Sequence, residues 1–350
     1  AAPLDGNTVF EIGSISKVFT GTLLADMALR GEVSEDDPIR MYLPEGIEAP
    51  SRAGVEITLQ HLATHRSGLP RLPSNLAPQD WSNPYADYTP EDLYAFLSSY
   101  ELPRDIDAQA EYSNLGAGLL GFLLSEHLGV RFEDAVRERI LDPLGMGMSG
   151  IRLTPEMSSA LAVGHDVGGD PVPLWDLETL AGAGGIRSNL DDMLRFMSAS
   201  LGEATTPVGR ALHDAHRVRA DMERGMAIGL NWITRSTGEQ RTIWHNGGTA
   251  GFRTFAGFDP DRDVAVVVLT NSAVGADDIG FHLLNPALPL EPPAMPEFAE
   301  REAIELEGAL LDRYSGEYQL MPQMMVTVRR GEGSSLDIQL TGQPPVRAYA

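Results

Sequence analysis

Apolar positions recur with a helical period through the first two-thirds of the chain. The segment Ser14–Arg30 is apolar around most of its circumference and ends at Gly31, which predicts a helix that is buried on nearly all sides. Loops rich in Pro, Gly and Asn separate the later helical segments, so we expect residues 35–235 to be mainly helical. These segments are Leu59–Thr64, Pro90–Ser99, Leu115–Leu128, Phe132–Leu141, Leu190–Leu201 and Val208–Met222.

The last third of the chain alternates apolar and polar positions, as strands do. Strands are expected at Arg241–His245, Arg253–Phe258 and Val264–Thr270, and one more at Thr8–Ile12, before the first helix. The Asp-Pro-Asp sequence within Asp259–Asp263 predicts a hairpin between the last two of the three.

The C-terminal end has its own pattern. Pro286–Pro296 is rich in proline and predicts a linker, followed by a short helix to about Arg313. Two strands are then expected, at Met325–Arg329 and Leu336–Leu340. No internal repeat is found.

Composition predicts a globular protein without nucleic-acid or membrane partners. Of 350 residues 43% are apolar, which is ample for a buried core, and 26 basic against 50 acidic residues give a net charge of −24. This charge repels nucleic acid and anionic membrane surfaces. The longest apolar stretch, near Leu115–Leu124, is too short to span a bilayer, and no leader precedes Ser14. The absence of cysteine excludes disulfides and thiol nucleophiles and leaves the compartment open.

Ser14 and Lys17 form a Ser-x-x-Lys pair that contains the only lysine of the chain. Every other cation is arginine, which suggests that position 17 requires an amine, because an amine loses its proton at accessible pH and a guanidinium does not. If Ser14 opens the helix, both side chains share a face, and a desolvated lysine can take the proton of the hydroxyl. The positive end of the helix dipole favours an oxyanion there. The simpler interpretation is a serine N-cap followed by an exposed lysine.

Tyr112 and Asn114 lie in a loop directly before a predicted helix, where catalytic side chains are often displayed. A phenol at this place can move a proton between serine and leaving group, and the asparagine amide can orient a substrate carbonyl. Taken alone the pattern is weak, because a loop tyrosine is more often a packing residue.

His245, Asn246, Gly247 and Gly248 end a predicted strand. Two consecutive glycines let a substrate lie along the strand edge, and the Gly248 N–H is a candidate second oxyanion donor beside that of Ser14. The alternative is a hairpin turn with an incidental histidine.

In this order, Ser-x-x-Lys, Tyr-x-Asn and His-x-Gly resemble the motifs of the serine beta-lactamase and penicillin-binding-protein superfamily. The likeness is to its class C-like branch, which also holds D,D-peptidases and the family VIII carboxylesterases. It covers roughly residues 3–275. Stretches outside the motifs contribute to it: Pro3–Gly13, Leu62–Pro70, Ala183–Gly185 with Ser188, and Gly229–Trp232.

The resemblance implies a role for each motif residue. Ser14 would be the acylated nucleophile, Lys17 its proton partner and Tyr112 the general base or acid. Asn114 would be a substrate-orienting amide and His245 the third-motif residue, followed by the substrate-binding strand edge of Asn246, Gly247 and Gly248.

The resemblance also implies an α+β fold of three layers, in which helices flank an antiparallel sheet and the site lies where an inserted all-α domain meets the sheet. The sheet domain would comprise residues 1–34 and 236–285, and the insertion residues 35–235. Residues 286–298 would be the linker and 299–350 a partial appended β domain. Periplasmic or secreted localisation would follow from the same resemblance.

His245 is a departure from the family pattern, because most class C beta-lactamases carry lysine there. That ammonium engages the carboxylate of the antibiotic and favours ionisation of the tyrosine. A histidine near its usual pKa of about 6.5 is mostly neutral at pH 7, which weakens both effects. We therefore expect a carboxylesterase with weak or no beta-lactam turnover.

The ends of the chain are the second departure. Family members usually place a helix and two strands before the Ser-x-x-Lys helix, whereas 13 residues precede Ser14 here. The end from Tyr314–Tyr318 resembles an appended β domain but is expected to stop after about two strands. Either the chain is truncated at both ends, or another segment or subunit covers the sheet edge, in which case a homo-oligomer is possible.

Two other motifs have structural interpretations. Gly116–Gly121 spells the dinucleotide fingerprint, but no strand precedes it, so close helix packing on small residues is favoured. His61 and His65 have the spacing of a zinc helix, yet Leu62 stands where a zincin needs glutamate. We expect no metal and no cofactor.

Three functions remain open. The first is an acyl-serine hydrolase acting on a small ester or lactam, with esters preferred. The second is a class C-type beta-lactamase or D,D-peptidase proper. The third is a catalytically weak penicillin-binding or scaffold protein of the same fold. Ester, lactam or peptide preference and acyl chain length depend on loops whose shape the pattern does not predict.

Overall fold

The computed structural model describes residues 4–238, 240–291, 306–321, 324–331, 333–340 and 346–349. It divides into two compact units, Ala1–Pro292 and Pro293–Ala350. The predicted division of the first unit into a sheet domain and an all-α insertion remains a prediction, as do the predicted boundaries of the linker. Part of that linker, from residue 292 onward, lies outside the described residues.

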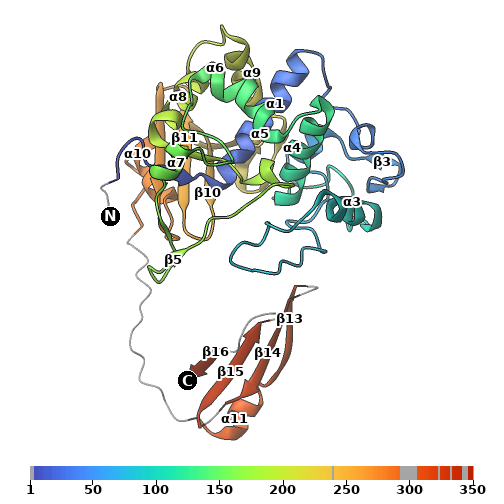
Figure 1. The fold of residues 1–350 in the computed structure, drawn as a ribbon, viewed down its shortest axis with the longest axis vertical. Helices are drawn as coiled ribbons and strands as arrows, with labels where there is room; N and C mark the ends of the chain where they lie inside the picture. Colours follow the sequence, from blue (N-terminus) through green and yellow to red (C-terminus); the bar gives the residue numbers. More distant parts are fainter. Residues whose placement is uncertain are drawn as a thin grey trace. The chain divides into compact units, whose positions relative to one another are not determined.

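The first unit is organised around an antiparallel sheet with the strand order β12-β11-β10-β9-β8-β7 (Figure 1). The predicted strands and the hairpin between β11 and β12 are confirmed. The sheet consists of β7 (Ala220–Asp221), β8 (Met226–Ile228), β9 (Ile233–Thr237), β10 (Gln240–Gly248), β11 (Arg253–Asp259) and β12 (Val264–Thr270).

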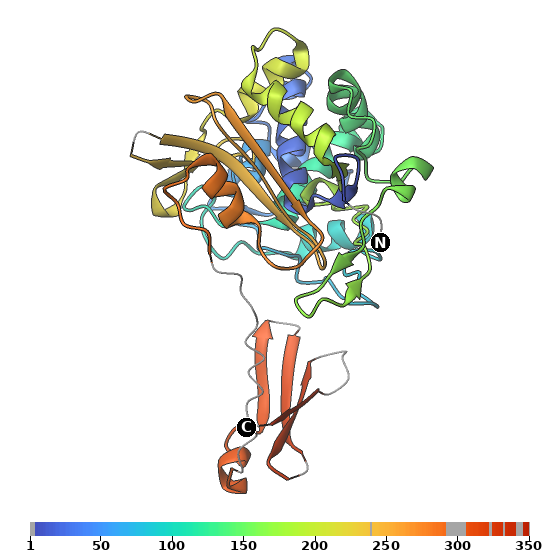
Figure 2. The same ribbon diagram turned by 90° about the vertical axis from the view of Figure 1, so that its left-hand side faces the viewer.

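Helices cover both faces of this sheet, as the predicted three-layer fold requires (Figure 2). Because side chains alternate along a strand, Phe255 points to one face and Phe258 to the other. Phe255 packs against α10 (Asp277–Leu284), where a Cβ on Gly280 would lie 2.2 Å from its ring. Phe258 meets Trp232 with a centroid separation of 5.5 Å on the opposite face. The sequence pattern did not predict α10.

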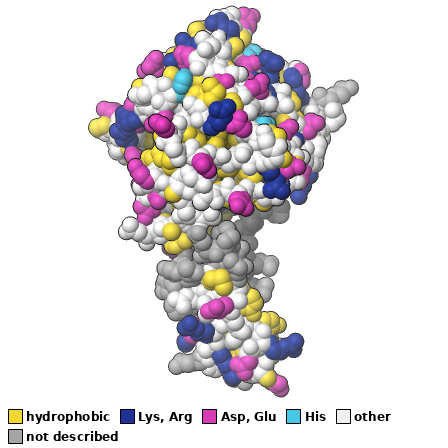
Figure 3. All heavy atoms as spheres, turned by 90° about the vertical axis from the view of Figure 1, so that its right-hand side faces the viewer, with side chains coloured by type: hydrophobic (Ala, Val, Ile, Leu, Met, Phe, Trp, Pro, Cys, Tyr) yellow, Lys and Arg dark blue, Asp and Glu magenta, His cyan; other side chains and the backbone are white. Residues whose placement is uncertain are grey.

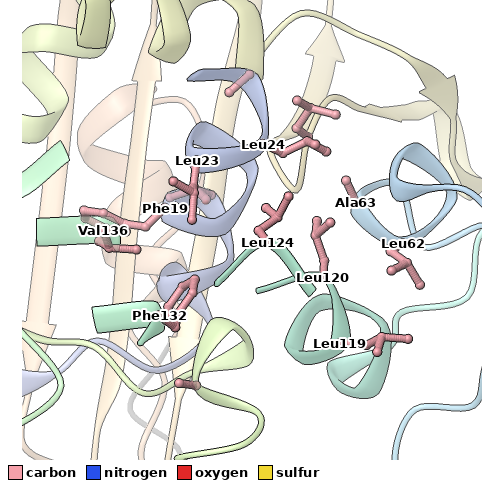
Figure 4. Packing of buried hydrophobic residues seen from close by; sticks show 14 of the residues in the cluster. Phe19, Leu23, Leu24, Leu62, Ala63, Leu119, Leu120, Leu124, Phe132 and Val136 are labelled. Atoms are coloured by element: carbon pink, nitrogen blue, oxygen red, sulfur yellow. The ribbon is translucent and has the colours of Figure 1, made fainter. Parts of the chain in front are cut away.

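The helix α1 (Ser16–Leu29) is the centre of the hydrophobic core. Every residue from Ser16 to Met27 is buried, which confirms the prediction made from its apolar circumference. Figure 4 shows Leu24 of α1 facing Leu120 and Leu124 of α4 (Asn114–Leu128). Each such side chain contributes roughly 1.5–3 kcal/mol through removal from water.

The predicted helical segments are confirmed except at one point, and two short helices, at Asp142–Leu144 and Pro155–Ser159, were not predicted. The segment Val208–Met222 is helical only to Ala215, because the Ala215 carbonyl then accepts from Leu230 N–H and the chain turns into β7. The helices are α2 (Leu59–Ala63), α3 (Pro90–Ser99), α5 (Phe132–Val136), α6 (Asp142–Leu144), α7 (Pro155–Ser159), α8 (Leu190–Leu201) and α9 (Pro207–Ala215), with short turns η1 (Gly13–Ile15), η2 (Ile39–Tyr42), η3 (Arg137–Leu141), η4 (Ala181–Ala183) and η5 (Glu223–Gly225).

The section 35–235 also contains strands. β7, β8 and part of β9 lie within it and belong to the main sheet. The strand predicted before the first helix is β1 (Val9–Glu11), which pairs with β6 (Arg187–Asn189) from that section. The section 35–235 also contains two hairpins: β2 (Ser51–Arg52) with β3 (Val55–Glu56), and β4 (Gly164–His165) with β5 (Pro171–Val172).

The second unit is a four-stranded antiparallel sheet in the order β13-β14-β15-β16, preceded by α11 (Gly308–Asp312). The expectation of about two strands here was wrong. The two predicted strands correspond to β14 (Met324–Arg330) and β15 (Ser335–Leu340). Two further strands flank them: β13 (Gly316–Met321) pairs with β14, and β16 (Val346–Tyr349) pairs with β15. Short strands without strict alternation give little signal in a sequence.

Acidic and basic side chains are interspersed over the face shown in Figure 3. None of the helices in the described residues is long and apolar enough to cross a membrane. Those residues also contain no group of three or more His, Asp or Glu side chains arranged to hold a metal ion.

Candidate active site

Ser14 and Lys17 are in direct contact at the start of α1. Ser14 lies in the single turn η1, and Lys17 lies one turn later, so their side chains share a face. Lys17 Nζ donates to Ser14 Oγ over 2.9 Å and to the carbonyl oxygen of Ala183 over 2.6 Å. The lysine is therefore not an exposed residue after a serine N-cap, because its side chain is fully buried.

The Lys17 amine is held in surroundings that favour its neutral form. Burial lowers the pKa of Lys17 well below its usual value, and the positive charge of Arg71 lowers it further. The segment that supplies Ala183 is itself tied to α1, because Thr20 Oγ1 donates to Gly182 O over 2.8 Å and Ile186 N–H donates to Ser16 Oγ over 3.0 Å.

Tyr112 reaches this pair from a loop that is fastened to the chain around His65. The backbone N–H of Glu111 donates to the carbonyl of His65 over 2.8 Å, and that of Ser113 donates to His65 Nδ1 over 3.3 Å. Ser113 then caps α4 by accepting from Gly116 N–H over 2.8 Å. Residues on both sides of Tyr112 are thus fixed, which positions the phenol.

The Tyr112 ring is surrounded by the other groups of the site. Lys17 Nζ lies 4.9 Å from its centroid, and the rings of His65 and His245 have centroids 4.6 and 6.1 Å away. Burial raises the pKa of Tyr112 to about 12, against the lowering influence of the nearby Ser14 hydroxyl. The phenol therefore keeps its proton at neutral pH.

Asn114 is the first residue of α4 and presents its amide beside Tyr85. Burial raises the pKa of Tyr85 and the nearby Asn114 amide opposes that shift, while the buried oxygen Oδ1 of Asn114 has no partner among the described residues. An unpaired buried amide oxygen is an acceptor that a bound molecule can satisfy.

The end of β10 offers an edge that is free of strand pairing. Its pairing with β9 ends at Trp244↔Ile233, whereas its pairing with β11 continues to Gly248↔Arg253. The η1 turn lies against this end: a Cβ on Gly247 would lie 2.0 Å from Ile12 O, and one on Gly13 would lie 2.6 Å from Gly248 N. Gly13 also has a φ of +53°, so glycine is required directly before the serine.

His245 faces the site in a neutral form. It is fully buried; burial, followed by the charge of Lys17, lowers the pKa of His245 to about 3. Because its Nδ1 lies 2.6 Å from the carbonyl oxygen of Asn246, Nδ1 carries the proton. Nε2 is therefore an acceptor, and it has no partner among the described residues.

The Asn246 side chain does not lie with those of Ser14, Lys17, Tyr112 and His245. Successive strand residues point to opposite faces, so Asn246 faces α10 and donates to Asp277 Oδ2 over 2.6 Å. The prediction that Asn246 binds substrate is not supported for its side chain. The structure does bring together Ser14, Lys17, Tyr112 and His245, with Asn114, Gly247 and Gly248 around them.

Two neighbours of Tyr112 were not predicted to be part of the site. The sequence predicts a structural role for His65 and no role for Arg71, whose guanidinium carbon lies 5.2 Å from the Tyr112 centroid. His61, by contrast, completes a capping box with Thr58, in agreement with a structural role. The spacing of these residues in the sequence carried no signal of their approach to Tyr112.

The glycines of Gly116–Gly121 lie in the packed interior of α4. A Cβ on Gly118 would lie 2.8 Å from Leu180, and one on Gly121 would lie 2.9 Å from the Cα of Gly182. Close helix packing is thus confirmed, and it places α4 against the segment that binds Lys17.

The sequence of residues 1–284 matches the family model described as Beta-lactamase. The chain belongs to the beta-lactamase family. A beta-lactamase of Escherichia coli K12 is 29% identical over 302 residues, 77% of each chain. The D-alanyl-D-alanine-carboxypeptidase/endopeptidase AmpH of the same strain is 31% identical over 290 residues, 76% of this chain and 72% of that protein.

Solved structures agree with this membership. A class C beta-lactamase superposes with a TM-score of 0.68 at 26% identity, covering 77% of this chain and 79% of that one. A beta-lactamase/D-alanine carboxypeptidase from Pseudomonas syringae, at 22% identity, shares the fold with a TM-score of 0.72 over 83% of this chain and 87% of that one. The predicted fold and superfamily are thereby confirmed, and the chain is a member of a serine hydrolase family.

Proposed function

We propose that this beta-lactamase-family chain is an acyl-serine hydrolase that prefers esters to beta-lactams. The observation that supports it most is the contact between Ser14 Oγ, the buried Lys17 amine and the Tyr112 phenol. A hydroxyl becomes a useful nucleophile when a neighbouring base can take its proton, and a lysine with a lowered pKa is such a base.

In the first step, Ser14 Oγ attacks the ester carbonyl carbon while its proton passes to Lys17 Nζ. The backbone N–H groups of Ser14 and Gly248 would hold the oxyanion that forms. When the intermediate collapses, the C–O bond to the leaving group breaks. Tyr112 donates its proton to the leaving-group oxygen and receives a proton from the Lys17 ammonium. The products of this step are an acylated serine and a free alcohol.

In the second step, water attacks the acyl carbon. Its proton passes through Tyr112 to Lys17 as the new C–O bond forms. Ser14 Oγ then leaves and takes the proton back, which releases the carboxylic acid. Asn114 would orient the acyl group through its unpaired amide oxygen and its N–H donors.

The preference for esters rests on His245. A neutral histidine with an acceptor nitrogen cannot provide the cationic contact that the resemblance assigns to lysine at this position. Loss of a hydrogen bond to a charged group costs about 1.5–3 kcal/mol, which weakens the binding of an anionic lactam.

We expect kcat/KM for 4-nitrophenyl butyrate to exceed that for nitrocefin. His245→Lys should raise nitrocefin turnover by about tenfold without a matching gain on the ester, because it supplies the missing charge. His245→Asn, which adds no charge, is the matched control. Spectrophotometric assays of both substrates check this, and a wild-type enzyme faster on nitrocefin would contradict the proposed preference.

The dependence on pH follows from the three buried groups. Lys17 must be unprotonated to accept the serine proton, so kcat/KM should fall as pH drops through its lowered pKa. His245, with a pKa of about 3, stays neutral and Tyr112, with a pKa of about 12, stays protonated between these two values. A profile on a neutral ester should therefore show one acid limb and then stay level to about pH 10.

The His245→Asn variant separates the two readings of that acid limb. If Lys17 causes it, the limb stays in place in the variant. A limb that disappears with the histidine would mean that His245 titrates during turnover and that its neutral role is wrong.

A second candidate is a beta-lactamase or D-alanyl-D-alanine carboxypeptidase, favoured by the relatives that carry these activities. A scaffold without turnover is the third. Nitrocefin and D-Ala-D-Ala peptides tested beside the esters distinguish the first two, and intact-protein mass spectrometry with a fluorophosphonate detects the third by the lack of an adduct.

We also propose that copies of the chain associate through β12. This strand ends the main sheet, and no described strand pairs with its outer edge. Such an edge is a template for pairing with another chain.

A further inference from the structure

Arg71 is an exposed residue beside Tyr112. Its guanidinium carbon stands over the Tyr112 ring, 5.2 Å from the centroid, while its backbone carbonyl accepts from the N–H of Asn114 over 3.0 Å. Its charge acts on Lys17, whose pKa it helps to lower, and on Tyr112. The side chain is therefore close to the groups around Ser14 and open to solvent.

Arg71 has no carboxylate partner in the described residues. Neither an ion pair nor a side-chain hydrogen bond of Arg71 occurs there. Arg66, five residues earlier, pairs with Asp107. Arg71 therefore lies over the Tyr112 ring, near Ser14, without a partner for its guanidinium group among the described residues. Its N–H groups remain available to bind an anion from solution.

Arg71 and His245 approach Tyr112 from different parts of the fold. Arg71 is tied to the first residue of α4, next to the Asn114 amide, whereas His245 belongs to β10 of the sheet. In the proposed reaction Asn114 orients the acyl group. An anion held by Arg71 would therefore sit on the acyl side of the bond that breaks, and not at the position that the family lysine serves.

We propose that Arg71 is a specificity-determining residue that binds a carboxylate carried on the acyl chain, so that the preferred substrates are monoesters of dicarboxylic acids. This rests on the proposed esterase function and narrows its substrate class. A bidentate guanidinium–carboxylate contact would place the ester carbonyl between Asn114 and Ser14.

The test compares two esters that differ only in the terminal group, the 4-nitrophenyl monoester of adipic acid and 4-nitrophenyl hexanoate. Arg71→Gln should lower the ratio of their kcat/KM values by about tenfold, the effect of one ionic hydrogen-bonded contact. Taking the ratio cancels the general effect that loss of the Arg71 charge has on Lys17. Arg210→Gln removes a charge from α9 and should leave the ratio unchanged.

Binding of adipate alone gives a second measurement that does not require turnover. Isothermal titration should detect adipate binding to the wild type, its loss in Arg71→Gln and its weakening as salt rises from roughly 0.05 to 0.5 M. This result would support the anion site even if neither ester were hydrolysed, in which case the esterase proposal alone would fail. Unchanged ester ratios, or equal adipate binding by wild type and variant, would overturn the role of Arg71.

Discussion

Replacing Ser14 by alanine is expected to lower kcat for ester hydrolysis by about 10⁴-fold or more and to abolish labelling by a fluorophosphonate. The variant lacks the Oγ atom that the proposed mechanism acylates. It should still fold, because Ser14 is only partly buried and Lys17 keeps its hydrogen bond to Ala183 O. Intact-protein mass spectrometry and steady-state assays measure the two effects.

Ser16→Ala is the matched control for this experiment. Ser16 lies two residues after Ser14, and its hydroxyl accepts from Ile186 N–H, so the change removes a structural contact and leaves Ser14 intact. The control should retain the adduct. An adduct of equal yield on Ser14→Ala would show that another residue is the nucleophile.

Tyr112→Phe is expected to reduce kcat by about 10²–10⁴-fold, the range for loss of a general acid or base. The phenylalanine ring preserves the contacts with His65, Arg71 and Lys17, whereas the hydroxyl near Ser14 and its transferable proton disappear. Stopped-flow measurements of nitrophenol release, with separate acylation and deacylation phases, would show which step depends on the phenol.

Tyr88→Phe serves as its control, because Tyr88 is also buried and hydrogen-bonded, over 3.1 Å to Asn75 Oδ1, but away from Ser14. We expect this variant to stay within about threefold of the wild type. Comparable losses in both variants would mean that tyrosine hydroxyls act through stability, and the proton-transfer role of Tyr112 would be withdrawn.

Much of the fold could be predicted because its elements are long or strongly patterned. The helix from Ser16 to Leu29 is apolar around most of its circumference, and the hairpin of β11 and β12 is marked by turn residues. The ends of elements were harder: Val208–Met222 combined a helix with the start of a strand, since tertiary hydrogen bonds at Ala215 override the local preference.

The candidate site was predictable where chemistry restricts the residue type. Lys17 was identified because one amine among arginines is chemically distinct, and its contact with Ser14 follows from helix geometry. His65 and Arg71 escaped prediction because they reach Tyr112 through a loop, whose path no periodicity encodes. The Asn246 side chain was misplaced because the strand register was unknown, and one residue along a strand reverses the face.

The tight approach of η1 to the end of β10 has an evolutionary consequence. Main-chain atoms of Gly13 and Gly248 meet there without side chains between them, so the spacing of the reactive centre depends on backbone packing alone. Substitutions at other positions around Tyr112, such as Arg71 or His245, can therefore change which substrates are bound while Ser14 stays in place. Few mutations can change the substrate of such a scaffold, because the residues that bind the substrate are separate from the backbone packing that positions Ser14.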